Sequence, residues 1–400
     1  MMERKVIILT EYALDLQNGA AYSRMLCYSR ACPDMLFRIY RMGLKSEKEN
    51  EFVRVTENLE IKKGCVYPNS YTYRNFFKLF DFVAPLKLIS QIRKESGKEP
   101  YTVLLYSSHF FLFLSAFLCF RFDKKVKLIV EKNELELGIV LNQSPAGGYQ
   151  KYVSMALFPV KIVFAAIIDR MTRYADGIIT ISTGLERLYQ KNKNLVTVPI
   201  LVDTDRFSAS VEKMPGINLL YIGALTKKKD GLSWLISMAG QIKSSLPDSY
   251  RIDLIGTGSK KVVHDLLRLI KDTGIEDKVR ILPEVSSAMI PAIIGQYRFG
   301  LLTRSRNLQT KYGFATKLGE YLAAGLPVIT TSISDNQIFL TDRIDSLIVG
   351  FSDESLKDAL MQCVSMTDEQ RNNMSDSARR LALEKFHYRN YSHQLIKILK

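Results

Sequence analysis

The sequence predicts an α/β protein built from two Rossmann-like, doubly wound domains that face a cleft. Short apolar runs typical of buried strands alternate with helical patterns along the chain. The length of 400 residues exceeds one ordinary core and suits two domains of about 200 residues each. The net charge of +15 is uneven, with 29 Lys and Arg against 19 Asp and Glu in residues 1–200.

The N-terminal half begins with the buried-strand run Val6–Leu9, and Asn18 and Gly19 precede a predicted helix. The uncharged run Tyr101–Phe120 approaches membrane-spanning length, but Ser107, Ser108 and His109 interrupt it. A span needs about 20 consecutive apolar residues, so we expect a buried strand, a turn and a helix rather than an inserted segment. Further predicted strands are Leu36–Tyr40, Thr102–Tyr106, Lys127–Val130 and Gly177–Ile181.

The C-terminal half continues the alternation from the strand Leu219–Gly223, which leads into three lysines, Lys227 to Lys229. These lysines suit an anionic ligand, although a solvated loop would have the same composition. The sequence GTGSKK after the next strand lacks the glycine spacing of a phosphate loop and is interpreted as a turn. The other predicted elements are the strands Ile252–Ile255, Lys278–Leu282 and Phe299–Thr303 and the helix Ser287–Gln296.

Residues 311–330 carry the most specific pattern. A helix is predicted over Ala315–Ala324, and Gly325 ends it before the strand Val328–Thr331. Free N–H groups at the start of this helix suit a diphosphate, and Glu320, one turn later, can bind the hydroxyls of a ribose. The pattern therefore predicts a nucleotide-sugar pocket, with an ordinary helix-to-strand connection as the structural alternative.

These residues resemble the C-terminal signature of the family 4 (group 1) retaining glycosyltransferases of the bacterial surface-polysaccharide type, which have the GT-B architecture. In that signature a Glu, seven residues and a second Glu precede a small-residue helix and Gly-x-Pro-Val. The second Glu matches Glu320, followed by Gly325 and Pro327. Tyr312 stands at the first Glu position and Ala224 at the position of a diphosphate-binding Arg.

The resemblance implies roles for particular residues. Lys228 or Lys229 supplies the cation that faces the diphosphate, and Glu134 and Tyr312 complete the catalytic candidates. His109 and Asn133 are the acceptor-binding candidates, although a lone His is more often structural. The donor-binding candidates are Asn18, Gly19, Gly223, Thr316, Lys317, Leu318 and Glu320.

The stretch Val196–Phe207 resembles the interdomain crossing of that family. We therefore predict an acceptor-binding N-terminal domain over residues 1–205 and a nucleotide-sugar-binding C-terminal domain over residues 206–384. Residues 385–400 are expected to form a helix that returns to the N-terminal domain.

Cysteine usage and motifs limit the chemistry. Five cysteines, an odd number without metal-ligand spacing, favour a reducing cytoplasm, and the N-terminus lacks a secretory signal pattern. No cluster has metal-ligand spacing and no nucleophile motif appears, so neither a metal nor a cofactor is expected. The resemblance implies a front-face displacement in which the leaving diphosphate helps to deprotonate the acceptor hydroxyl.

Two stretches of the basic N-terminal half interleave aromatic or apolar residues with Lys and Arg, namely residues 71–94 and 151–173. This composition suits peripheral contact with an anionic membrane, although core helices with a solvated basic face would also fit. Nucleic acid is the competing partner for a basic chain, but no nucleic-acid-binding motif appears, and none is expected to bind.

The sequence thus predicts a cytoplasmic retaining glycosyltransferase at the inner face of the membrane. It would move a sugar from a nucleotide donor, with UDP the expected nucleotide, to a hydroxyl of a lipid-linked or surface polysaccharide such as a capsule. One alternative is a nucleotide-sugar epimerase on the same fold, which would need further acid and base carboxylates. Another is a binding protein that has lost catalysis, a possibility raised by Tyr312 and Ala224.

Overall fold

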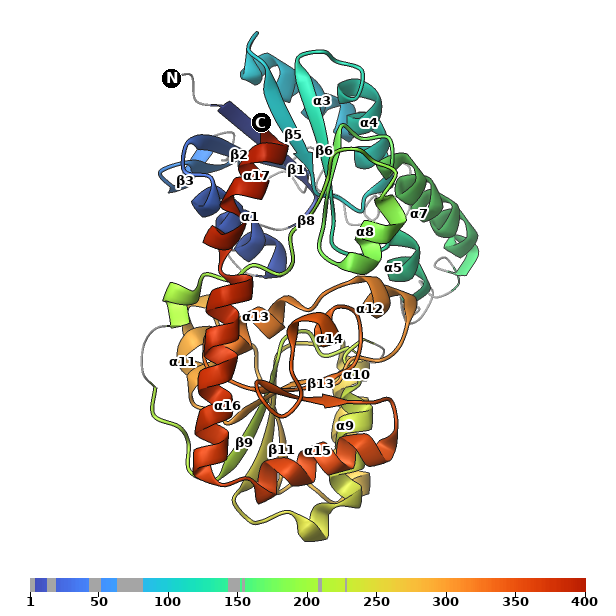
Figure 1. Ribbon diagram of the computed structural model, residues 1–400. Helices are drawn as coiled ribbons and strands as arrows, with labels where there is room; N and C mark the ends of the chain where they lie inside the picture. Colours follow the sequence, from blue (N-terminus) through green and yellow to red (C-terminus); the bar gives the residue numbers. More distant parts are fainter. Residues whose placement is uncertain are drawn as a thin grey trace. The chain divides into compact units, whose positions relative to one another are not determined.

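The computed structural model describes residues 4–12, 19–42, 52–62, 82–142, 152, 155–207, 211–226 and 229–400 (Figure 1). The chain divides into two compact units, both of the predicted α/β class. Unit 1 runs to Pro199 and also contains Tyr388–Lys400, and unit 2 is Ile200–His387. The domain boundaries expected from the sequence, after residues 205 and 384, lie a few residues from these divisions.

Unit 1 contains an eight-stranded sheet, in the order β3-β4-β2-β1-β5-β6-β7-β8 among the described residues. Neighbouring strands are parallel except for β3 and β4, which pair antiparallel. The strands are β1 (Arg4–Thr10), β2 (Met35–Arg41), β3 (Phe52–Thr56), β4 (Leu59–Lys62), β5 (Tyr101–Leu105), β6 (Val126–Lys132), β7 (Gly177–Thr180) and β8 (Leu195–Thr197).

The helices of unit 1 form two groups. Helix α1 packs against α17, while α4 packs against both α3 and α7 (Figure 1). The last helix is tied to the sheet because the Thr102 hydroxyl donates to the Leu399 carbonyl at 2.8 Å. The helices are α1 (Ala20–Ala31), α3 (Val83–Ser96), α4 (Phe110–Phe120), α5 (Glu136–Asn142), α7 (Phe158–Thr172), α8 (Thr183–Tyr189) and α17 (Ser392–Leu399).

The uncharged run Tyr101–Phe120 forms strand β5, a short turn and helix α4, as predicted. His109 caps the helix, since its Nδ1 accepts a hydrogen bond from the Leu112 N–H at 3.2 Å. Within the described ranges, no helix combines the length and hydropathy required to cross a bilayer.

A buried ion pair links α1 to the sheet of unit 1. Arg24 donates through Nε to Glu131 and through Nη1 and Nη2 to the carbonyls of Pro199 and Val198, at 2.7 and 2.8 Å. Tyr28 also donates to Glu131, at 3.0 Å. A buried charge is tolerated when it is paired and hydrogen-bonded, so these contacts fix α1 against β6.

Unit 2 contains a six-stranded, fully parallel sheet in the order β11-β10-β9-β12-β13-β14. The strands are β9 (Ile217–Ile222), β10 (Tyr250–Ile255), β11 (Val279–Leu282), β12 (Phe299–Leu302), β13 (Val328–Thr331) and β14 (Ser346–Val349). The helices are α9 (Leu232–Gln241), α10 (Lys260–Thr273), α11 (Ile290–Gly295), α12 (Leu308–Tyr312), α13 (Thr316–Ala323), α14 (Asn336–Phe339), α15 (Asp353–Ser365) and α16 (Asp368–Leu381).

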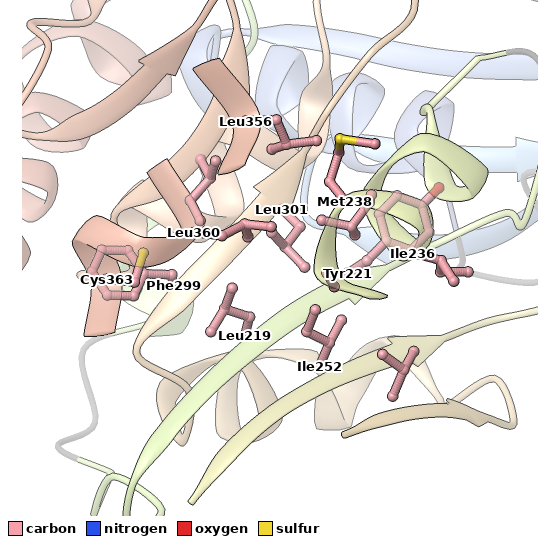
Figure 2. Close-up of a cluster of buried hydrophobic side chains, with 14 of the residues drawn as sticks. Leu219, Tyr221, Ile236, Met238, Ile252, Phe299, Leu301, Leu356, Leu360 and Cys363 are labelled. Atoms are coloured by element: carbon pink, nitrogen blue, oxygen red, sulfur yellow. The ribbon is translucent and has the colours of Figure 1, made fainter. Parts of the chain in front are cut away.

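The core of unit 2 lies between the sheet and two of its helices. Strand residues such as Leu219, Ile252 and Leu301 meet Met238 of α9 and Leu360 of α15 (Figure 2). All five side chains are at most 3% exposed, so the strands are buried by continuous apolar runs, as expected for a parallel sheet.

Two glycines allow the loops after β9 and β10 to approach each other. Gly256 has φ of +149°, and a Cβ there would lie 1.9 Å from the Gly223 carbonyl oxygen. Gly223 itself has φ of +142°. Side chains at these positions would be strained and would separate the two loops.

We predict that Gly256→Ala destabilises the protein by about 2 kcal/mol, because the methyl group would overlap a backbone oxygen that cannot move freely. Gly350→Ala is the matched control, since its Cβ would meet ordinary contacts at 3.6 Å. The control should change stability by less than about 0.5 kcal/mol in urea unfolding. Equal effects of the two substitutions would show that the close approach at Gly256 is unimportant.

Candidate functional site

The candidate site lies where the strand order of unit 2 reverses. From β9, strands β10 and β11 lie on one side, and β12, β13 and β14 lie on the other. Ligands of open parallel sheets bind outside the carboxyl ends of the strands at such a switch point. Gly223 follows β9 and Arg304 lies two residues beyond β12, so both lie at this switch point. We call the region around Gly223, Asp230, Arg304 and the start of α13 the crevice of unit 2.

Gly223 makes room for the side chain of Lys317. A Cβ at position 223 would lie 2.2 Å from Lys317 Cε, so a side chain there would displace the end of the lysine side chain from its present position. The Lys317 ammonium donates to the Tyr221 hydroxyl at 2.8 Å and lies 3.6 Å from Asp230. Burial lowers the pKa of this ammonium, while Asp230 opposes the shift.

Asp230 is the acceptor that organises the crevice. It accepts a hydrogen bond from the Tyr221 hydroxyl at 2.6 Å, and Arg304 Nε lies 3.8 Å from its other oxygen. Burial acts to raise the pKa of Asp230, but the charges of Lys317 and Arg304 outweigh it, and the pKa falls below its usual value. Asp230 is therefore ionised at neutral pH.

Arg304 retains hydrogen-bonding capacity although it is only 3% exposed. Its Nη1 donates weakly to the Gly313 carbonyl at 3.4 Å, and its Nε has no acceptor among the described residues. A buried guanidinium whose Nε has an ion-pair partner but no hydrogen-bond acceptor can still donate to an anionic ligand such as phosphate.

Helix α13 presents its N-terminus and Glu320 to the same region. The N-cap residue Ala315 has no side chain that can accept from the first N–H groups, which include those of Thr316 and Lys317. Glu320 is half-buried, and its carboxylate makes no hydrogen bond within the described part of the chain. Burial raises the pKa of Glu320, while the charges of Arg206 and Lys317 oppose the shift.

The charges around the crevice leave a positive surplus. Lys229 acts electrostatically on both Asp230 and Lys317. Among the described groups that influence one another here, the cations Arg206, Lys229, Arg304 and Lys317 outnumber the carboxylates Asp230 and Glu320. Such a surplus, together with free helix N–H groups, favours a ligand that carries a diphosphate.

The structure brings together three donor-binding candidates, Gly223, Lys317 and Glu320, and the catalytic candidate Lys229. Thr316 starts α13 beside them, whereas the Leu318 side chain is fully buried in the core. The Leu318 N–H donates to the Ala315 carbonyl at 3.0 Å, so this group is already engaged within the helix start.

Of the remaining catalytic and donor-binding candidates of the two loops, the structure describes Tyr312 and Gly19. Tyr312 ends α12, and the Lys311 ammonium lies 5.5 Å from its ring centroid. Gly19 precedes α1, is exposed and has φ of +92°. Asn18 and Lys228 lie outside the described residues.

The unit 1 candidates follow the ends of β5 and β6. His109 is committed to capping α4, which supports the structural role that a lone His most often has. Asn133 Oδ1 is buried without a hydrogen-bond partner in the described part of the chain. The charge of Glu134 acts on Tyr12, which places it near the end of β1. No group of three or more His, Cys, Asp or Glu in the described ranges could hold a metal ion.

Sequence reasoning missed Tyr221, Asp230 and Arg304. In the sequence, Tyr221 has the pattern of an ordinary buried strand residue. Asp230 follows three lysines, and the sequence predicts the anion-binding role for those lysines rather than a role for the carboxylate. Arg304 offered a signal, because a charged residue that closely follows a buried parallel strand lies at the ligand-binding edge of the sheet.

Comparisons with known proteins agree with this fold. A sucrose-phosphate synthase from Thermosynechococcus elongatus has a TM-score of 0.75 at 12% identity, covering 99% of this chain and 98% of that chain. Anabaena HepE in complex with UDP has a TM-score of 0.65 at 12% identity, covering 99% of both chains. Trehalose-6-phosphate synthase OtsA has a TM-score of 0.69 at 12% identity, again covering 99% of both.

These similarities define a protein of the GT-B fold. Residues 216–366, which include the candidate site apart from Arg206, match the family model of the glycosyl transferases group 1. This part of unit 2 thus has the sequence features of the group 1 glycosyl transferases, as the sequence resemblance indicated, and the fold of the chain is that of glycosyltransferases. No curated protein sequence gives a significant match.

We predict that Arg304→Met weakens UDP binding at least tenfold, or about 1.4 kcal/mol, and leaves uridine binding unchanged, because a buried guanidinium at this edge would bind the diphosphate and not the nucleoside. Arg304→Lys, which keeps the charge, should lose less. Calorimetric titration measures both ligands, and Lys271→Met, on the exposed end of α10, is the control. Equal losses for UDP and uridine would exclude a diphosphate-specific role.

Proposed function

We propose that this glycosyltransferase moves a sugar from a UDP-sugar to a hydroxyl of a lipid-linked or surface polysaccharide, with retention of anomeric configuration. The observation that supports the donor most strongly is the positive crevice of unit 2, in which Arg304 Nε has no hydrogen-bond acceptor among the described residues and Glu320 lies within reach of the charges of Arg206 and Lys317. A nucleotide sugar carries both matching groups, a diphosphate and a ribose diol. The HepE structures contain UDP and UDP-glucose, which motivates the choice of UDP.

The chemistry follows from charge. When the glycosidic bond to the donor breaks, negative charge develops on the leaving diphosphate oxygen. Lys229, Arg304 and the first N–H groups of α13 would stabilise that charge from fixed positions. We propose that these groups are sufficient without a metal ion or cofactor, so chelation by EDTA should leave turnover unchanged.

Lys229 is expected to act mainly on turnover. Lys229→Met should lower the rate of UDP release from the preferred UDP-sugar roughly 10- to 100-fold, because its charge is needed most when the phosphate leaves. The KM for the donor should change by less than about threefold. Slow hydrolysis of UDP-glucose, UDP-galactose and UDP-N-acetylglucosamine, followed as free UDP, provides the assay, with Lys271→Met as the control.

The outcomes of this assay separate the alternatives. Equal losses in turnover and donor affinity would contradict the proposed role of Lys229. Binding of UDP without release of UDP from any donor would favour the binding protein that has lost catalysis. Conversion of the sugar to its epimer, with UDP still attached, would favour the epimerase.

We further propose that unit 1 contacts an anionic membrane through the outer surface of α4 and α7. Only Ala165, Ile168 and Thr172 of the apolar helix α7 are buried. Ring contacts between Phe110 and Phe164, with centroids 3.8 Å apart, join the two helices. The exposed apolar side chains on and next to these helices include Leu118, Phe122, Val163 and Tyr174, at 54–76% exposure.

Basic residues accompany this surface. Arg170 and Arg173 are exposed at the end of α7, and the Arg121 guanidinium donates to the Tyr174 carbonyl. Apolar burial and attraction to lipid charge act together on such a surface, and the membrane would bring a lipid-linked acceptor to the enzyme. Of the basic stretch 71–94 expected to contribute, residues 71–81 lie outside the described residues.

Phe122→Ser combined with Val163→Asp should reduce binding to vesicles of phosphatidylglycerol and phosphatidylcholine several-fold, because both changes remove exposed apolar area. Co-sedimentation measures the bound fraction, and 0.5 M salt should lower wild-type binding by screening. Leu267→Ser, at an exposed leucine of α10 in unit 2, is the control. Wild-type protein that stays unbound, or a variant that binds equally, would contradict the proposal.

A further inference from the structure

Two neighbouring cations lie at the end of the unit 2 sheet that is opposite the crevice. Lys213 stands before β9 and Arg298 directly before β12, and these two strands are parallel neighbours. Both cations are therefore at the amino ends of the strands, whereas the crevice lies at the carboxyl ends. The pair takes no part in the donor site described above.

Hydrogen bonds hold the segment that carries Lys213 beside the residues that lead into Arg298. The Lys213 ammonium donates to the Tyr297 carbonyl at 2.9 Å. The following N–H, that of Met214, donates to the Gln296 carbonyl at 2.9 Å. The two segments are thus joined at consecutive positions, which fixes the place of the lysine relative to the guanidinium.

Within the described residues, neither cation forms an ion pair with a carboxylate. Arg298 Nε is buried and has no hydrogen-bond acceptor in the described part of the chain. Asp253 receives the Tyr297 hydroxyl at 2.7 Å and the Arg280 guanidinium at 2.7 and 2.8 Å, so this nearby carboxylate is already engaged. A buried donor without an acceptor calls for an explanation, such as a ligand that supplies one.

The two charges act on each other. Burial and the charge of Arg298 lower the pKa of the Lys213 ammonium to about 8, and no carboxylate of the described residues opposes the shift. An anion that contacts both side chains would remove this repulsion. It would accept from Arg298 Nε and from the ammonium N–H groups that the Tyr297 carbonyl does not use.

We propose that Lys213 and Arg298 form a second anion-binding site of unit 2, which takes a small oxyanion such as inorganic phosphate, sulfate or the phosphate group of a small ester. An oxyanion offers several acceptor oxygens to the two donors, and a dianion neutralises both cations. The proposal is independent of the donor crevice and of the proposed transfer reaction.

Competitive acetylation of the full chain with trace acetic anhydride, followed by peptide mass spectrometry, measures each lysine separately. At pH 7 an amine with a pKa of about 8 is roughly one-tenth unprotonated, against less than about 0.1% for an ordinary lysine, so Lys213 has a reactive fraction that a ligand can protect. Inorganic phosphate at about 50 mM should slow the acetylation of Lys213 at least threefold relative to sodium chloride of equal ionic strength. Lys271, exposed on α10, is the internal control and should react equally in both salts.

Substitutions of Arg298 test whether the protection requires the pair. Arg298→Met should abolish the protection by phosphate and raise the pKa of Lys213 toward its usual value, because the neighbouring charge is removed. Arg298→Lys, which keeps the charge, should retain part of the protection. UDP affinity should be unchanged in both variants and serves as the folding control. Sulfate and glycerol 3-phosphate, tested in the same way, show whether the site prefers a free anion or a phosphate ester.

Calorimetric titration with sulfate, with UDP in the crevice, provides a second measurement. Arg298→Met should bind sulfate at least about fivefold more weakly than the wild type, because it lacks one of the two charged donors. Equal acetylation of Lys213 in phosphate and in chloride would overturn the inference. Undiminished protection or undiminished sulfate binding in Arg298→Met would overturn it as well.

Discussion

The buried carboxylate of Asp230 is the contact on which the donor crevice depends. It lies at the end of a loop that carries lysines, and it draws together a hydroxyl from β9, an ammonium from α13 and a guanidinium from the loop after β12. Without this negative charge, Lys317 and Arg304 would repel each other in a region of low polarity. The Asp230 carboxylate thus allows the two cations to lie close together at one edge of the sheet.

Glycines complete this arrangement. Gly223 leaves the space that the Lys317 side chain occupies, and Gly231, with φ of +60°, begins α9 directly after Asp230. A Cβ at position 231 would lie 2.1 Å from the Thr303 carbonyl oxygen. The loops that follow β9 and β12 can therefore approach closely enough for one carboxylate to serve both.

Much of the fold could be predicted from the sequence, because buried parallel strands have continuous apolar runs. The strands of unit 2 from β9 to β13 and the helix α13 lie within a few residues of their predicted positions. Strand β14 was not predicted, since Ser346–Val349 is short and follows charged residues without a strong pattern. The predicted helix Ser287–Gln296 is divided into a 3-10 turn and α11, whose start coincides with Pro291 near its N-terminus.

The candidate site was less accessible to sequence reasoning. Glu320 and Lys317 could be predicted because a short helix with a local pattern carries both. Asp230 and Arg304 matter through contacts between loops that are distant in sequence, which no local pattern encodes.

A crystal structure of the protein with UDP would test the central claim most directly. We expect the diphosphate within hydrogen-bonding distance of Arg304 and the first N–H groups of α13, with the ribose hydroxyls on the Glu320 carboxylate. UDP bound elsewhere, or bound here with Glu320 and Arg304 making no contact to it, would contradict the assignment of this crevice as the donor site.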